Sequence, residues 1–322
     1  MKRRETTMKA FQLNAYGQPP MMGLADAERP VLRSDDLLVR VVCAGINQMD
    51  WKLAEGFLRD FLPHQLPVTL GWEIAGVVEA LGPDCTSFAI GDPVFGMLDL
   101  MRNGGFAEYV AVAEGKMARI PNAVSFQQAA AVPLSAITAW NSLFAFGALK
   151  AGQDVLILGG AGGVGHLAIQ LAKRAGARVT AVCSAAGGRL ALGCGADAVV
   201  DYNKDDFVRF GPFDLVLDAV GGETRNRSWK ALREGGALAT IVPPWDTVAD
   251  VKRTDVRSML VGAAPDGATM RQLAVAMESG ELRPQIAQTC GLDGCTAAIL
   301  ASKAGHTHGK LVIEVGTPQA RV

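Results

Sequence analysis

The chain has 322 residues, enough for about two domains that each bury a core of their own. Basic and acidic side chains are nearly balanced, 31 against 32, so the chain lacks the positive charge that non-specific binding to nucleic acid requires. Residues 120–149 form the longest stretch without Asp, Glu, Lys or Arg, but prolines and polar side chains interrupt it. We therefore expect neither a nucleic-acid-binding protein nor a membrane-spanning segment.

The start of the chain and its cysteines indicate the compartment. Residues 1–7 are polar and no apolar segment follows them, so they do not resemble a secretion signal. The six cysteines stand singly, without a Cys-x-x-Cys pair, which is typical of reduced thiols used as small apolar side chains. We expect a cytoplasmic protein.

The first 115 residues are expected to be mostly β. Short runs rich in β-branched residues at positions 37–42, 75–80 and 109–112 predict strands. Turns are expected at the glycine- and proline-rich segments 82–83, 91–93 and 103–105.

From about residue 152 the pattern changes to strands that alternate with helices. A strand over residues 154–158 is followed by a glycine cluster, and apolar residues then recur at helical spacing from Val164 to Ala175. Such alternation predicts βαβ units and a parallel sheet covered on both faces. Further strands are expected over residues 178–183, 198–201, 214–220 and 237–242, with helices around 188–192 and over 223–232.

After about residue 265 the pattern changes again. It predicts helices over residues 269–279 and 294–304 and a closing strand over 310–315. This tail is too short for a third domain, so we expect it to pack on the N-terminal β region. The α/β segment is then an insertion between two parts of one domain.

The strongest local motif is a glycine-rich turn between the expected strand at 154–158 and the helix that follows. Gly160, Gly162 and Gly165 satisfy G-x-G-x-x-G, in which the glycines permit a tight turn, close approach of a pyrophosphate and close helix–strand packing. The helix N-terminus would supply N–H groups to the phosphates. The alternative is a strand-to-helix turn without a ligand. The residues expected to contact a dinucleotide are Gly160, Gly162, Gly163, Val164 and Gly165.

The residues after the second expected strand indicate which dinucleotide is bound. An NAD site places Asp or Glu there, about 20 residues past the motif, but no carboxylate occurs before Asp197. Ser184 and Arg189 suit a 2′-phosphate instead, because a guanidinium binds phosphate through paired N–H groups. NADPH is therefore the expected cofactor. Alternatively, Ser184 is a helix cap and Arg189 a solvated surface charge.

A series of motifs runs along the chain: residues 8–10, 44–52, 71–78, 91–94, 105–109, 134–140, the glycine turn and residues 196–202. Taken together, these motifs resemble the zinc-independent quinone oxidoreductases of the medium-chain dehydrogenase/reductase superfamily, over about residues 8–315. The resemblance implies a GroES-like, mostly β domain over residues 1–128 plus 266–322, and a Rossmann domain, a doubly wound parallel sheet, over residues 129–265. It also implies a homodimer paired through edge strands of the Rossmann sheet. Residues 1–7 precede the usual start of the family.

The same resemblance argues against a catalytic metal. Zinc-dependent relatives have a cysteine and a histidine where this chain has Asn47 and Trp72, and neither an amide nor an indole is a competent zinc ligand. A proton-relaying hydroxyl would fall near Met49, whose thioether cannot do that work. We expect no metal.

The resemblance also assigns a site. We hypothesise that the nicotinamide lies in the cleft between the domains and faces Asn47, Asp50, Trp51 and Thr138, the last by analogy with a family threonine. Less specific readings remain open: Asp50 as a helix cap, Asn47 as a turn residue and Trp51 as core packing. By the same resemblance, the further cofactor contacts are Tyr202 at the adenosine phosphate and Ala219 and Val242 along the cofactor groove.

Without a Lewis acid, the expected reaction is one in which hydride attack itself yields a stabilised anion. A quinone or an α,β-unsaturated carbonyl meets that need, because the charge delocalises onto an oxygen. No dedicated general acid is identifiable, and water is the default proton donor. The alternatives are an enoyl-thioester reductase and a non-catalytic NADPH-binding redox sensor.

Overall fold

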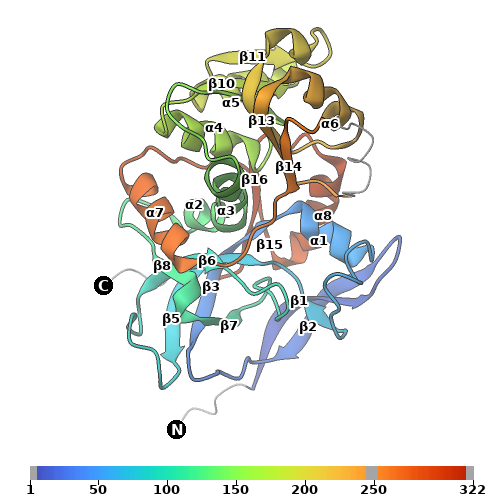
Figure 1. Ribbon diagram of the computed structural model, residues 1–322. Coiled ribbons are helices and arrows are strands. Elements are labelled where there is room, and N and C mark those ends of the chain that lie inside the picture. Colours follow the sequence, from blue (N-terminus) through green and yellow to red (C-terminus); the bar gives the residue numbers. More distant parts are fainter. Residues whose placement is uncertain (1–5, 244–252, 317–322) are drawn as a thin grey trace. The chain divides into compact units, whose positions relative to one another are not determined.

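The computed structural model describes residues 6–243 and 253–316, which fold as two compact units (Figure 1). Residues 135–263 and Gly280–Arg283 form the α/β unit. The rest of the described chain, from both ends of the sequence, forms the β-rich unit. The sequence analysis expected the divisions after residues 128 and 265; the units divide after Leu134 and Ala263. Residues 1–5 of the polar start lie outside the described residues.

The α/β unit contains a six-stranded sheet whose ladders are all parallel. The strand order is β11-β10-β9-β12-β13-β14, the doubly wound order in which two βαβ halves meet at the first strand. The predicted Rossmann sheet is confirmed. Its strands are β9 (Asp154–Leu158), β10 (Arg178–Cys183), β11 (Ala198–Asp201), β12 (Phe213–Asp218), β13 (Leu232–Thr240) and β14 (Arg257–Leu260).

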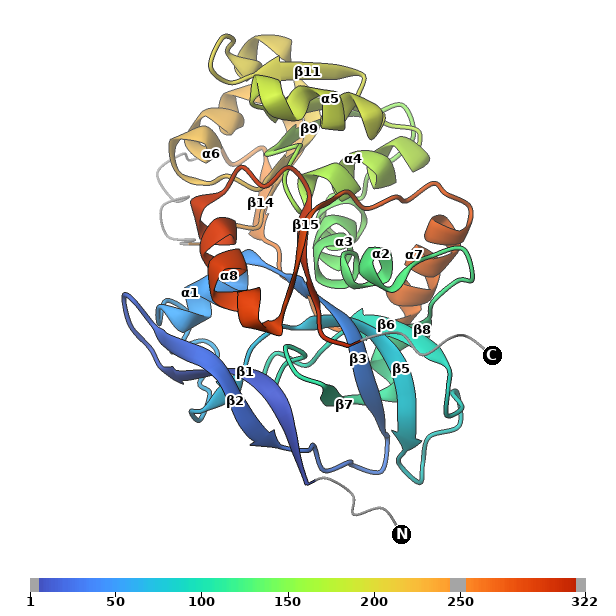
Figure 2. The same cartoon turned by 180° about the vertical axis from the view of Figure 1, so that it is seen from behind.

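Both faces of this sheet are covered, as its continuous apolar strands require. Helices α4 (Gly165–Arg174) and α5 (Ala185–Gly193) cover one face, where α5 lies over Val199 (Figure 2). Short helices cover the opposite face, where Phe207 and Trp229 pack on Leu156 and Val216. Those short helices are η3 (Phe207–Phe210), α6 (Gly222–Ser228) and η4 (Trp229–Ala231).

Three expected boundaries around α6 were wrong. The helix predicted over residues 223–232 ends at Ser228, because Leu232 pairs with Phe213 and so begins β13. The strand predicted to reach residue 220 ends at Asp218, whose carboxylate accepts hydrogen bonds from the N–H groups of Val220 and Gly221. The strand predicted over residues 237–242 runs over Leu232–Thr240.

The uncharged stretch at residues 120–149 is mostly helical. It forms α2 (Phe126–Ala130), α3 (Pro133–Trp140) and a π-helix, η2 (Asn141–Phe146). Among the described residues, no helix is long and apolar enough to cross a bilayer.

The β-rich unit holds two sheets. The larger has the order β15-β16-β3-β5-β6-β8, with β7 also paired to β3, and the smaller has the order β2-β1-β4. The closing strand β16 pairs antiparallel with β3, so the prediction that the tail packs on the N-terminal β region is confirmed. The strands are β1 (Thr7–Ala15), β2 (Met21–Glu28), β3 (Asp36–Ile46), β4 (Val68–Thr69), β5 (Glu73–Leu81), β6 (Pro93–Met97), β7 (Tyr109–Ala113), β8 (Met117–Arg119), β15 (Ile286–Gly291) and β16 (Lys310–Glu314).

Short helices complete this unit. Helix α1 (Gln48–Ala54) follows β3 directly, and the polar side chains of interest lie at that junction. The other helices are α7 (Gly267–Glu278), α8 (Cys295–Ala304) and the single turns η1 (Glu114–Lys116) and η6 (Leu292–Gly294).

Candidate functional site

The glycine turn lies at the carboxyl end of β9, where it leads into α4. Gly159 has φ +77°, and the N–H groups of Gly159 and Gly160 both donate to the carbonyl of Val182 on β10. The left-handed residue of the turn is therefore Gly159, one position before Gly160, the first glycine of the motif. Gly162, Gly163 and Val164 stay partly exposed. This is the place where a doubly wound sheet binds a dinucleotide.

Side chains would not fit at two of the motif's glycines. A Cβ at Gly160 would lie 2.7 Å from the Cβ of Ala181, and one at Gly165 would lie 2.2 Å from the carbonyl oxygen of Gly159. A Cβ at Gly162 meets only that same oxygen, at 3.2 Å. The first and third glycines are thus required by packing, whereas the second leaves open space beside the N-terminus of α4. That space suits a pyrophosphate.

Two predicted contacts of the adenosine phosphate come together at the end of β10. Ser184 is the N-cap residue of α5, but its hydroxyl makes no capping hydrogen bond. The backbone N–H of Tyr202 donates to Cys183, so Tyr202, half exposed, lies beside the end of the same strand. Arg189 is exposed one turn into α5 and makes no ion pair among the described residues.

A carboxylate that the sequence analysis overlooked also lies at this edge. Asp201 ends β11 and is paired with Cys183 in the parallel ladder, whereas Asp197 lies before β11 and is bound to Lys173. The Oδ1 atom of Asp201 accepts hydrogen bonds from the backbone and side chain of Asn203, at 3.1 and 3.2 Å. The carboxylate is therefore held by its own loop. Only the pairing of β10 with β11 could have revealed it.

The predicted groove residues Ala219 and Val242 both lie at the carboxyl edge of the sheet. The Cβ of Ala219 lies 3.6 Å from where a Cβ on Gly159 would be, and Val242 lies 2.9 Å from the equivalent position on Gly221. Asp218, fully buried, holds this edge together through Val220, Gly221 and the hydroxyl of Thr240, which donates at 2.7 Å. Asp218 is a supporting residue that the sequence analysis did not identify.

In the β-rich unit, the predicted residues Asn47, Asp50 and Trp51 lie together where β3 meets α1. Asn47 is nearly buried, and its Nδ2 donates to Oε1 of Glu73 at 2.7 Å. Its Oδ1 accepts from Nζ of Lys310 at 2.6 Å. Glu73 and Lys310 are both buried and form an ion pair at 2.6 Å. The sequence analysis assigned neither of them to the site.

Asp50 takes part in the capping of α1, but the N-cap residue is Asn47, and not Asp50 as the alternative above supposed. Asp50 is the third residue of α1, and its Oδ2 accepts from the backbone N–H of Asn47 at 2.6 Å. It is also fully buried, and Oδ1 has no hydrogen-bond partner of normal geometry among the described side chains and backbone. Burial raises the pKa of Asp50 to about 7, although the backbone N–H of Asn47 and the Lys310 ammonium act in the opposite direction.

Trp51 and Thr138 differ in their surroundings. The ring of Trp51 is partly exposed, meets Phe57 edge to face at 6.1 Å, and has the ammonium groups of Lys52 and Lys303 over it. It is therefore not core packing alone. Thr138 lies on α3 within the α/β unit, and its carbonyl accepts from the hydroxyl of Ser142 in the π-helix at 2.8 Å. π-Helical turns occur frequently at functional sites.

The donor set near Asn47 does not fit a zinc ion. Trp72 is buried in the core, where its indole N–H donates to the carbonyl of Arg102. The cation beside Asn47 and Glu73 is the ammonium group of Lys310. Among the described residues, no three His, Cys, Asp or Glu side chains are grouped to hold a metal. Thiolate, imidazole and several carboxylates are the ligands that zinc requires.

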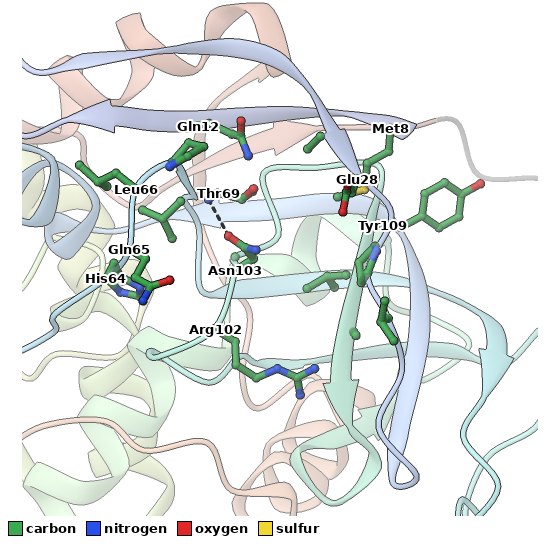
Figure 3. A pocket seen from close by; sticks show the side chains of 18 of the residues that line it. Met8, Gln12, Glu28, His64, Gln65, Leu66, Thr69, Arg102, Asn103 and Tyr109 are labelled. Carbon is green, nitrogen blue, oxygen red and sulfur yellow. Dashed lines mark hydrogen bonds between the residues drawn. The ribbon is translucent and has the colours of Figure 1, made fainter. Parts of the chain in front are cut away.

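A separate groove of about 890 Å³ crosses the β-rich unit. Figure 3 shows Gln12, His64, Glu28 and Tyr109 around it, with Asn103 accepting a hydrogen bond from the backbone of Thr69 at 3.0 Å. None of Asn47, Asp50 and Trp51 lines it. The groove is built from five separate segments of sequence, so no local motif could have predicted it.

Comparisons with known proteins agree with this architecture. A family model described as an alcohol dehydrogenase GroES-like domain matches residues 33–122, and one described as a zinc-binding dehydrogenase matches residues 194–313. The chain therefore belongs to the medium-chain dehydrogenase/reductase superfamily, and the protein is an oxidoreductase of that superfamily.

Its relatives within the superfamily include quinone and NAD(P)H oxidoreductases. The chain is 30% identical to the mitochondrial NAD(P)H oxidoreductase of Homo sapiens over 97% of its own length and 90% of that protein. It is 30% identical to the chloroplast envelope quinone oxidoreductase homolog of Arabidopsis thaliana, over 95% of this chain and 98% of that protein. The structure of the quinone oxidoreductase from Coxiella burnetii is 32% identical, with a TM-score of 0.88 over 96% of this chain and all of that one. The expected resemblance to quinone oxidoreductases is confirmed.

Proposed function

We propose that the protein is an NADPH-dependent, metal-independent oxidoreductase that transfers hydride to a quinone or an α,β-unsaturated carbonyl. The observation that carries the proposal is the glycine turn, whose partly exposed backbone lies at the N-terminus of α4 beside the ends of β10 and β12. The printed names of the relatives, quinone and NAD(P)H oxidoreductases, support the substrate class.

The chemistry has a simple balance. NADPH, when bound, supplies a hydride, and the substrate gains that hydride and one proton. The glycine turn, Ser184 and Tyr202 bind and orient the phosphates. Asn47, Asp50, Trp51 and Thr138 are the candidates for orienting the acceptor, because a fixed amide or hydroxyl dipole stabilises the charge that develops on the substrate oxygen. Asp50, whose pKa burial raises to about 7, is a candidate for holding the proton.

An assay of NADPH oxidation across quinones, enals, enones and enoyl thioesters tests the proposal. We expect turnover with a quinone or an enone. Turnover confined to enoyl thioesters would favour the enoyl reductase alternative, and tight NADPH binding without any turnover would favour a redox sensor.

Elemental analysis of protein prepared without added metal should find no stoichiometric zinc; one zinc per chain would contradict metal independence.

The cofactor preference gives a prediction of its own. Arg189→Ala is expected to weaken NADPH binding about tenfold and to leave NADH binding unchanged, because a guanidinium–phosphate pair contributes roughly 1–2 kcal/mol. Fluorescence titration with both nucleotides measures this. Lys150→Ala, which removes another exposed cation of the same unit, is the control and should change neither value. Equal or tighter binding of NADH by the native protein would refute the preference for NADPH.

We also propose a homodimer, as expected from the family resemblance. Among the described residues β14 pairs only with β13, so one edge of the sheet is unpaired, and Met259 and Leu260 on it are exposed. Unpaired edges of this kind readily accept a strand from a second copy. Sedimentation should give twice the chain mass of 33.8 kDa, and a Leu260→Lys variant should shift towards monomer. A native monomer at micromolar concentration would contradict the dimer.

The cytoplasmic location stays a proposal, which cell fractionation can test.

A further inference from the structure

The strongest polar arrangement outside the nucleotide site is centred on the ammonium group of Lys310. This side chain is 2% exposed and comes from the closing strand β16. Its Nζ donates to the carbonyl of Ile46 at 2.9 Å and to Oδ1 of Asn47 at 2.6 Å, and pairs with Oε1 of Glu73 at 2.6 Å. An ammonium group has three hydrogens, so every one of them has an acceptor.

Glu73 completes the arrangement from β5. Its Oε1 accepts from Nδ2 of Asn47 at 2.7 Å, and its Oε2 accepts from the backbone N–H of Leu134 at 2.8 Å. Gly45 leaves space for this carboxylate because it has no side chain. A Cβ at that position would lie only 2.3 Å from Oε1 of Glu73. A buried ion pair gives little net stability, since desolvation of both charges offsets their attraction. Its presence here therefore calls for another explanation.

The ion pair of Lys310 and Glu73 restricts the side-chain amide of Asn47, which lies between the cation and the anion. Its oxygen faces the ammonium group of Lys310 and its nitrogen faces the carboxylate of Glu73. The flipped amide would place N–H hydrogens against an ammonium and an oxygen against a carboxylate, and both contacts are repulsive. Only one orientation is compatible with the pair.

We propose that Lys310 and Glu73 are positioning residues for hydride transfer, which fix the orientation of the Asn47 amide and polarise it towards the substrate oxygen. The inference rests on the proposed function, because Asn47 is the residue through which it acts. The pair itself touches no substrate. Its role is to remove the alternative amide orientation before the substrate binds, which is the preorganisation that catalysis by fixed dipoles requires.

The test uses the charge-neutral double variant Glu73→Gln/Lys310→Met. Removing both charges together avoids leaving one buried charge unpaired, and glutamine at position 73 can pair with either orientation of the Asn47 amide. We expect kcat to fall about tenfold while the KM for NADPH changes less than about twofold, a coupling typical of residues in one hydrogen-bond network. In an Asn47→Ala background the same double substitution should leave kcat nearly unchanged. An equal fall in both backgrounds, or an unchanged kcat in the double variant, would overturn the proposal.

A matched control comes from a second ion pair of the same unit, in which the acidic partner is buried and the basic partner is partly exposed. Arg102 binds Asp36 through two hydrogen bonds of 2.8 and 2.7 Å, and Asp36 is fully buried. The neutral double variant Asp36→Asn/Arg102→Met should alter stability and leave kcat unchanged. A comparable fall in kcat there would mean that any loss of a buried pair in this unit impairs the enzyme, and would count against a positioning role.

A measurement without turnover separates this inference from the proposed function. In protein labelled with ¹⁵N at asparagine side chains, the N–H bonds of the Asn47 amide should have a high order parameter, and their protons should exchange slowly with solvent. In the Glu73→Gln/Lys310→Met variant the order parameter should fall and the protons should exchange rapidly. If the native amide is already averaged, the orientation is not fixed and the inference fails, whatever the enzyme reduces. If it is fixed but no substrate is turned over, only the proposed function fails.

Discussion

Gly162→Val is expected to lower the affinity for NADPH at least about a hundredfold while the α/β unit stays folded, a loss of roughly 3 kcal/mol in binding. A Cβ at this position meets only the carbonyl oxygen of Gly159, at 3.2 Å, a tight contact that a shift of a few tenths of an ångström relieves. The same side chain would occupy the space that the pyrophosphate needs beside the N-terminus of α4. Fluorescence titration measures the affinity, and urea unfolding measures the stability.

Two other glycines of the same unit serve as controls for this result. Gly165→Ala should destabilise the unit by about 1–3 kcal/mol through overpacking, because its Cβ would lie 2.2 Å from a backbone oxygen. Gly193→Ala, in α5, has open space around the added methyl group and should stabilise the helix by about 0.5–1 kcal/mol. If Gly162→Val bound NADPH like the native protein, the glycine turn would not be the nucleotide site.

The second prediction concerns pH, and it depends on Asp50. Burial raises the pKa of this carboxyl from 3.8 to about 7, so between these values the folded protein holds a proton that the unfolded chain releases. The contribution of this carboxyl to the free energy of unfolding should therefore be fully present below pH 4 and be lost as the pH rises to 7, a change of up to about 4 kcal/mol. In Asp50→Asn the side chain can still cap α1, and this decline should be absent.

Urea unfolding of both proteins at a series of pH values measures the difference. Asp36 provides a contrast of opposite sign: burial acts against its ionisation, but hydrogen bonds from Arg102 hold its pKa below the ordinary value. Stability contributed by that pair should be lost only as the pH falls through the acidic range. If native protein and Asp50→Asn changed in parallel from pH 4 to 7, the carboxyl of Asp50 would not be protonated in the folded state.

Local sequence predicted the α/β unit better than the β-rich unit. Strands β10 and β11 have the bounds expected from their apolar runs, and the glycine turn lies between β9 and α4 as predicted. Parallel strands are buried on both faces and give continuous apolar signals. Strand β2 gave no comparable signal, because its side chains alternate between exposed and only partly buried positions.

The residues that the sequence analysis missed depend on long-range pairing. Lys310 is 263 positions from Asn47, and the two meet only because β16 pairs with β3. Asp201 enters the nucleotide edge only because β11 pairs with β10. The helix predicted beyond Ser228 is a further case, since the pairing of Leu232 with Phe213 ended it. Periodicity reports burial along a segment and carries no information on which segment will lie beside it.

The antiparallel pairing of β3 with β16 has a consequence for biosynthesis. The α/β unit is nearly continuous in sequence, so a nascent chain can fold it during translation, as contiguous domains generally do. Glu73 is synthesised long before Lys310, which lies on β16, the partner strand of β3. Until β16 has been made, Glu73 has no counter-charge to be buried with, and its side chain must remain in water. We expect the large sheet of the β-rich unit to close only after β16 has been synthesised.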